Sequence, residues 1–138
     1  MRRFTLLAAA LSVLAVAAPA LSATDMTAPP VIKQRATGFG SVLARTDHQV
    51  LYYWNVEKRD FKVHCTGSCA KAWPPLIVRT RSAVPLHIPG ITGTFGTIRR
   101  PDGRLQVTRN RLPLYTYAHE RPRQVLCNNV NGWFVARA

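Results

Sequence analysis

The chain has 138 residues, 47% of them hydrophobic, which is enough for one small domain with one core. Its 19 lysines and arginines against 6 acidic residues give a net charge of +13. Carboxylates are therefore scarce, and neither a G-x-S-x-G nucleophile motif nor a phosphate-binding loop occurs, so the sequence argues against an enzyme.

The first predicted element is a secretory signal peptide over residues 1–23. Two arginines precede an apolar run from Phe4 to Ala18, and small residues follow as far as Ala23. The run is too short to span a bilayer. We expect cleavage after Ala23 or Ala20, a mature chain without a transmembrane segment, and a periplasmic or secreted location.

The positive charge suggests the class of partner. Removing residues 1–23 takes away two arginines and lowers the net charge from +13 to +11. A field of this sign attracts polyanions, which outside the cytoplasm are lipid head groups, lipopolysaccharide or wall polymers and not nucleic acid. The basic residues form no block of five or six, so the alternative is that they only keep the protein soluble.

The mature chain divides into a leader and one domain. Residues 24–35 contain two adjacent prolines and little periodic pattern, which predicts an extended leader. In residues 36–138, glycine and proline separate short runs rich in valine, threonine and aromatic residues. This pattern predicts an all-β fold, a small antiparallel domain with minor helix.

A first hairpin is predicted from two runs in the N-terminal half of this domain. Residues 41–45 and 50–56 have strand composition, and residues 46–49 join them. The connection contains Asp47, whose side chain can bond its own backbone and favour a turn.

A second hairpin has the clearer turn. Residues 94–99 and 104–108 flank Pro101-Asp102-Gly103, in which proline presets the turn and glycine permits positive φ. Further predicted strands cover residues 114–118 and 133–136, and residues 69–73 form one helical turn before two prolines.

A motif that occurs twice is the most informative feature of the sequence. Residues 51–57 (LYYWNVE) and 114–120 (LYTYAHE) share the order leucine, tyrosine, any residue, aromatic, two further residues and an acid. A tryptophan follows each copy, Trp73 or Trp133. We therefore predict two pseudo-repeats, about residues 38–78 and 94–137, each with a Tyr-x-aromatic strand.

This pattern resembles the Y-x-[FWY]-x-x-D motif of a family of predicted bacterial lipoproteins, also described as a secreted repeat of unknown function. The resemblance covers about residues 38–137. Supporting segments are residues 65–76, 98–103, 106–108, 113–115 and 132–135. The chain departs from the family in three ways: both motif acids are glutamate, no lipid-attachment cysteine follows the signal, and Cys127 looks like an addition. Export in soluble form is thus favoured over anchoring.

Two interpretations of the repeated motif remain open. Positions two apart in a strand face the same side, so each copy presents an aromatic pair that either fills the core or forms a ligand platform beside a carboxylate. A glycosidase-like use of the two glutamates requires them to face each other across a cleft. The candidate ligand-binding residues are Tyr52, Trp54, Glu57, Tyr115, Tyr117, Glu120, Trp73 and Trp133.

The three cysteines also allow two interpretations. In an oxidising compartment we expect Cys65 and Cys69 to form a disulfide around Gly67. Cys127 then remains as a thiol that is buried, reactive or paired with a second chain in a dimer. In another pairing, Cys127 bonds to Cys65 or to Cys69. Alternatively, His64 and the three cysteines bind copper or zinc.

The sequence thus predicts an exported, soluble, non-catalytic module that binds an anionic envelope polymer or membrane surface, with no cofactor. The alternative is a periplasmic metal-binding or redox protein that uses the histidine and cysteine cluster.

Overall fold

The computed structural model describes residues 28–138, so the predicted signal peptide lies outside the described residues. Short antiparallel strands form one four-stranded and two two-stranded sheets, with little helix, and the all-β prediction is confirmed. The strands are β1 (Val31–Ala36), β2 (Gly40–Arg45), β3 (Tyr52–Trp54), β4 (Ile77–Val78), β5 (Phe95–Arg99), β6 (Leu105–Arg109), β7 (Leu112–Pro113) and β8 (Trp133–Val135). The helices are η1 (Asn55–Arg59), α1 (Ser68–Ala72) and η2 (Arg81–Ala83).

The folded domain begins earlier than predicted. Residues 31–35, the end of the predicted leader, lie in β1, which pairs with β2 over its full length, from Val31↔Arg45 to Ala36↔Gly40. Val31 is 0% exposed and belongs to the hydrophobic core. The leader prediction is wrong for this segment because the two prolines stand before the strand and do not interrupt its backbone pairing.

The first predicted hairpin is present only near its turn. Ala44 bridges Val50, and the Asp47 side chain accepts the backbone N–H of Gln49 at 3.2 Å, as its turn role requires. Beyond the turn the chain leaves β2, and β3 pairs instead with β8 near the C-terminus. The strand predicted to continue to residue 56 ends at Trp54, and η1 begins at Asn55.

The second predicted hairpin is confirmed. β5 and β6 pair from Phe95↔Arg109 to Arg99↔Leu105, and Gly103 in the turn has a φ of 85°. β6 also pairs with β4 and β7. These two-residue strands carry too little pattern to be predicted from sequence.

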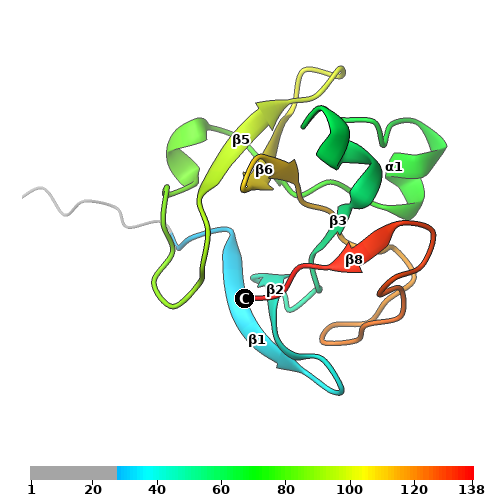
Figure 1. The fold of residues 1–138 in the computed structure, drawn as a ribbon. Helices are drawn as coiled ribbons and strands as arrows, with labels where there is room; N and C mark the ends of the chain where they lie inside the picture. Colours follow the sequence, from blue (N-terminus) through cyan, green and yellow to red (C-terminus); the bar gives the residue numbers. More distant parts are fainter. Residues whose placement is uncertain (1–27) are drawn as a thin grey trace, which may run out of the picture.

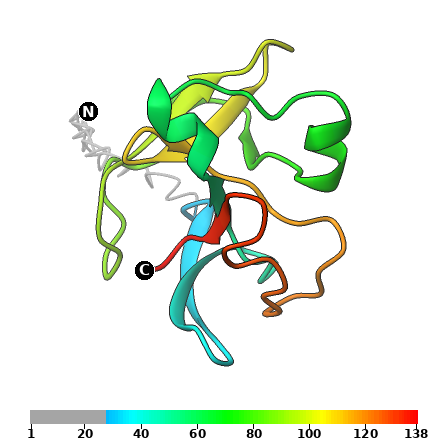
Figure 2. The same cartoon turned by 45° about the vertical axis from the view of Figure 1, so that its right-hand side comes forward.

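The sheets lie one after another through the molecule (Figure 1). In both ribbon views the β1–β2 pair lies at one end, the β5–β6 hairpin at the other, and β3 with β8 between them (Figures 1 and 2). The strand predicted at residues 114–118 is reduced to single bridges from Tyr115 to Tyr52 and to Pro75. The helical turn predicted at residues 69–73 is present as α1. No helix within residues 28–138 has the length and apolar character needed to cross a bilayer.

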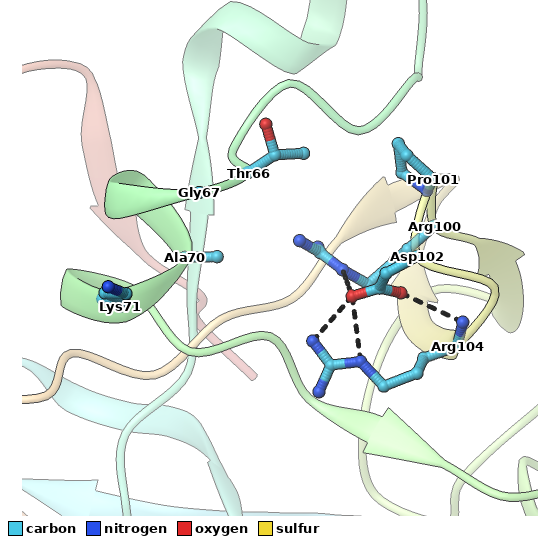
Figure 3. A pocket seen from close by; sticks show the side chains of 8 residues that line it. All are labelled: Thr66, Gly67, Ala70, Lys71, Arg100, Pro101, Asp102 and Arg104. Carbon is cyan, nitrogen blue, oxygen red and sulfur yellow. Dashed lines mark hydrogen bonds and ion pairs between the residues drawn. The ribbon is translucent and has the colours of Figure 1, made fainter.

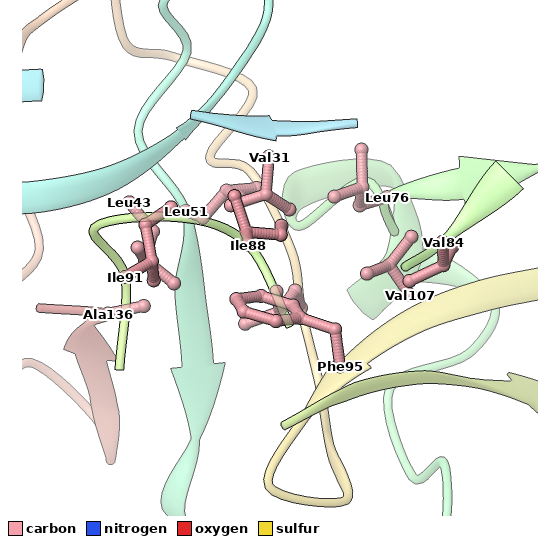
Figure 4. Packing of buried hydrophobic residues seen from close by; sticks show 11 residues of the cluster. Val31, Leu43, Leu51, Leu76, Val84, Ile88, Ile91, Phe95, Val107 and Ala136 are labelled. Atoms are coloured by element: carbon pink, nitrogen blue, oxygen red, sulfur yellow. The ribbon is translucent and has the colours of Figure 1, made fainter. Parts of the chain in front are cut away.

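Hydrophobic side chains from both ends of the chain fill the main core (Figure 4). The cluster joins Leu43 and Leu51 from the N-terminal half with Phe95 and Val107 from the four-stranded sheet, and it includes Val31 of β1. A second buried cluster contains most of the repeated aromatic motif. The two clusters leave the loops around α1 and the β5–β6 turn at the surface.

Candidate functional site

The two copies of the repeated motif lie antiparallel and bond each other. Tyr52 N–H donates to the carbonyl of Tyr115 at 2.8 Å, and Tyr115 N–H donates back to the carbonyl of Tyr52 at 2.9 Å. The hydroxyl of Tyr115 donates to Glu57 at 2.7 Å, and that of Tyr52 donates to Glu120. Each tyrosine is therefore bonded to the acid of the other copy, which accounts for the shared spacing of tyrosine and acid.

The aromatic residues of the two copies build one stack. Trp73 and Trp133 stack at its centre with ring centroids 3.9 Å apart and planes 6° from parallel. Trp54 of the first copy stacks on Trp133 at 5.3 Å, and Tyr117 of the second copy lies against Trp73 at 4.5 Å. The aromatic residue two positions after the tyrosine of each copy thus packs on the tryptophan that follows the other copy.

This arrangement is core and not a ligand platform. The tyrosine, acid and tryptophan of each copy are buried, with exposures of 9% or less for Tyr52, Glu57, Trp73, Tyr115, Glu120 and Trp133. The ligand-binding interpretation does not fit these six residues because little of their surface is accessible to a ligand. Trp54 and Tyr117, at the two ends of the stack, are half-buried. The two glutamates likewise do not line an open cleft, so they lack the setting of a glycosidase pair.

Burial dominates the electrostatics of the two acids. It raises the pKa of Glu57 and that of Glu120, because the charged form loses its hydration. Hydrogen bonds oppose this effect: Glu57 accepts the N–H groups of His64 and Cys65 at 2.8 and 3.3 Å, and Glu120 accepts that of Leu126 at 2.7 Å. The pKa values of Tyr52 and Tyr115 are also raised, by burial first and by the neighbouring carboxylates second.

The predicted disulfide is confirmed. Cys65 and Cys69 are bonded, with Cα atoms 5.2 Å apart, and the bridge closes the loop that leads into α1. Cys127 is a half-buried free thiol whose pKa is raised, chiefly by burial. Its pairing with a second chain stays a prediction.

The copper or zinc alternative does not fit the described residues. Two of its four ligands, Cys65 and Cys69, are bonded to each other and offer no thiolate. The His64 ring instead faces both carboxylate oxygens of Asp60 at 3.0 Å. Within residues 28–138 no group of three or more histidine, cysteine or acidic side chains is placed to hold a metal ion.

A basic pocket lies between the disulfide loop with α1 on one side and the β5–β6 turn on the other (Figure 3). Its volume is about 310 Å³. Three cations and a single carboxylate line it, together with small and neutral residues: Thr66, Gly67, Ala70, Lys71, Arg100, Pro101, Asp102 and Arg104.

Arg100 is the unusual member of this pocket because it is only 3% exposed. Its guanidinium donates to the side-chain oxygen of Gln106 at 2.5 Å and to the carbonyl of Cys65 at 2.8 Å, both neutral acceptors. Its Nε makes no hydrogen bond, and a carboxylate oxygen of Asp102 lies 3.7 Å away. The same Asp102 oxygen receives two hydrogen bonds from Arg104, at 2.7 and 2.9 Å.

The sequence contains no motif that marks this pocket. The predicted turn Pro101-Asp102-Gly103 fixes Arg100 and Arg104 as the residues on either side. The contact of this turn with the disulfide loop joins segments more than thirty residues apart, as in the bond from Arg100 to Cys65 with a separation of 35. A pattern of neighbouring residues in the sequence cannot predict such a contact.

Comparison with known proteins found no similar protein. No family model matches the chain, and neither the curated proteins nor the solved structures contain a match. The resemblance to the secreted repeat family stays a prediction, and the function has to be argued from the chain's own residues.

Proposed function

We propose that this chain is an exported, non-catalytic protein whose β domain binds an anionic component of the cell envelope, either a polymer or a membrane surface. The observation that carries the proposal is positive charge that the fold itself does not neutralise.

All five carboxylate side chains within residues 28–138 are already engaged. Asp47 pairs with Arg45, Asp60 with His64, and Asp102 with Arg104. The remaining two, Glu57 and Glu120, are the buried partners of the tyrosines. The acidic residues therefore have no further capacity to neutralise the basic ones.

The basic residues, by contrast, are largely unopposed. Of the lysines and arginines within residues 28–138, ion pairs reach only Arg45, Arg100 and Arg104. Most of the others are exposed, including Lys33, Arg35, Lys58, Arg59, Lys62, Lys71, Arg79, Arg81, Arg99, Arg111, Arg121, Arg123 and Arg137. Such a surface attracts polyanions at long range and loses this attraction as salt screens it.

Two features support export. The N-terminal residues 1–23 have the composition of a signal peptide, and the disulfide between Cys65 and Cys69 is typical of an oxidising compartment. The resemblance to a secreted repeat family supports the same location. The metal-binding alternative is not favoured, because the disulfide removes two of its three sulfur donors.

Binding to anionic vesicles and to lipopolysaccharide tests the proposal. We expect the purified mature protein to sediment with vesicles containing phosphatidylglycerol, and not with pure phosphatidylcholine, and to bind lipopolysaccharide. Both affinities should fall steeply as sodium chloride rises, because screening shortens the reach of surface charges to about 8 Å at physiological ionic strength. The proposal would be contradicted if the protein did not bind at low salt, or if its affinity did not change with the salt concentration.

A further inference from the structure

We infer that the pocket between α1 and the β5–β6 turn is a receptor for a phosphate group. The inference rests on the proposed binding of an anionic envelope component, and it names the chemical group and the place where that group docks.

The first argument is the incomplete compensation of a buried charge. Arg100 is 97% buried, yet the acceptors within hydrogen-bond distance of its guanidinium are neutral. A buried cation is costly unless a counter-charge accompanies it. The nearest counter-charge is Asp102, 3.7 Å from the Nε of Arg100, and it is shared with Arg104. An anion in the pocket adds the negative charge that this shared carboxylate supplies only in part.

The second argument is the charge of the pocket wall. Lys71, Arg100 and Arg104 contribute three positive charges and Asp102 one negative charge, which gives the lining a net charge of +2. Lys71 makes no ion pair within residues 28–138, so its ammonium is available. A phosphate monoester carries a charge of about −1.5 to −2 at pH 7, which matches this excess.

The third argument is the chemistry and size of the site. Arginine N–H groups suit phosphate oxygens, and Arg104, which donates from Nε and Nη2 to Asp102, keeps its Nη1 group for a ligand. The volume of about 310 Å³ exceeds the needs of a bare phosphate and leaves room for the group that carries it. A ligand attached to a larger lipid or polymer is therefore compatible with the pocket.

The surroundings of the turn extend the positive surface. A second hollow on the other side of Arg100 and Pro101 is lined by Lys62 and Arg99 and contains no acidic residue. A chain of phosphates that enters the first pocket thus passes further cations.

Glycerol 3-phosphate is the probe for this inference, titrated into the mature protein by isothermal calorimetry. We expect saturable one-to-one binding that is tighter than that of acetate. Lys71→Gln should weaken it about tenfold, which is the loss of one charge-assisted contact. Lys71 is chosen because it is exposed, whereas Arg100 holds buried contacts that folding needs. Arg121→Gln removes the same charge from an exposed residue outside the pocket and should change affinity less than twofold.

The outcomes separate this inference from the proposed function. If wild-type protein binds anionic vesicles but Lys71→Gln and Arg121→Gln lose affinity equally, the pocket is not a receptor and the general charge-driven function stands. If wild-type protein binds neither vesicles nor glycerol 3-phosphate, both fail. The source of the phosphate is read from vesicles of phosphatidic acid in phosphatidylcholine. A loss of binding in Lys71→Gln there identifies a lipid head group, and an effect confined to glycerol 3-phosphate identifies a soluble or polymer-borne phosphate.

Discussion

The two halves of the molecule share an interior and differ in their loops. In each half a tyrosine packs edge-on against the tryptophan that follows it, with ring centroids 5.3 Å apart for Tyr52–Trp73 and 5.1 Å for Tyr115–Trp133. The loop of the first half is closed by a disulfide and borders the basic pocket, whereas the loop of the second half carries a free thiol, Cys127. The repeated motif thus builds the core, and the candidate site lies where the disulfide loop of the first half meets the β5–β6 turn of the second.

The largest expected effect comes from breaking the shared interior. Trp73→Ala and Trp133→Ala should each lower the free energy of unfolding by about 3–5 kcal/mol, because each removes a buried ring from the centre of the stack. Trp54→Ala, at the half-buried end of the stack, should cost only about 1–2 kcal/mol. Urea unfolding followed by far-ultraviolet circular dichroism measures all three. Equal losses at Trp54 and Trp73 would contradict the assignment of the stack to the core.

A smaller effect tests the difference between the loops. Cys65→Ala/Cys69→Ala should lower the free energy of unfolding by about 2 kcal/mol, the loop-closure entropy expected for so short a loop. Cys127→Ala removes a half-buried thiol outside any disulfide and should change stability by about 0.5 kcal/mol or less. The same urea titrations, run with and without reductant, compare the two. A Cys127→Ala loss as large as that of the double variant would mean that Cys127 has a structural bond of its own.

Local signals in the sequence were sufficient for part of this architecture. The turn at Pro101-Asp102-Gly103 and the helical turn before two prolines depend on neighbouring residues, and both are present. β1 was missed because only its pairing with β2 makes it a strand, and Val31 reveals its burial only in the folded chain. An alternating pattern indicates which face of a strand is buried, but it does not indicate which other strand pairs with it. The pairing of β3 with β8 therefore could not be predicted from the sequence.

The candidate site shows the same division. The motif residues were found because they recur, yet recurrence did not decide between core and ligand platform, and only the crossed bonds to Glu57 and Glu120 do so. The pocket was missed because Lys71, Arg100 and Arg104 look like ordinary basic residues in the sequence. Its distinctive property is the burial of Arg100 beside neutral acceptors, which arises when distant loops meet.

The smallest expected difference between the halves is in how their two buried acids make the free energy of unfolding depend on pH. Burial raises the pKa of each acid in the folded state above its unfolded value of 4.5. The folded protein therefore binds the proton more tightly, and this contribution to stability is fully present below pH 4.5 and is lost as pH rises through the folded pKa. Glu57→Gln and Glu120→Gln remove the titrating group, so wild-type protein should lose stability relative to each variant as pH rises.

The size of that relative loss should differ between the two acids. Glu57 accepts two backbone N–H groups and Glu120 accepts one, and such bonds favour the charged form. We therefore expect the steeper pH dependence in the comparison with Glu120→Gln. Free energies of unfolding measured in urea at closely spaced pH values between about 4 and 8 give both differences, since titrating groups that do not interact with the substituted acid cancel between wild type and variant. A relative stability that rises with pH would show that hydrogen bonding outweighs burial at that acid, and the carboxylate would then belong to the core as a charged group.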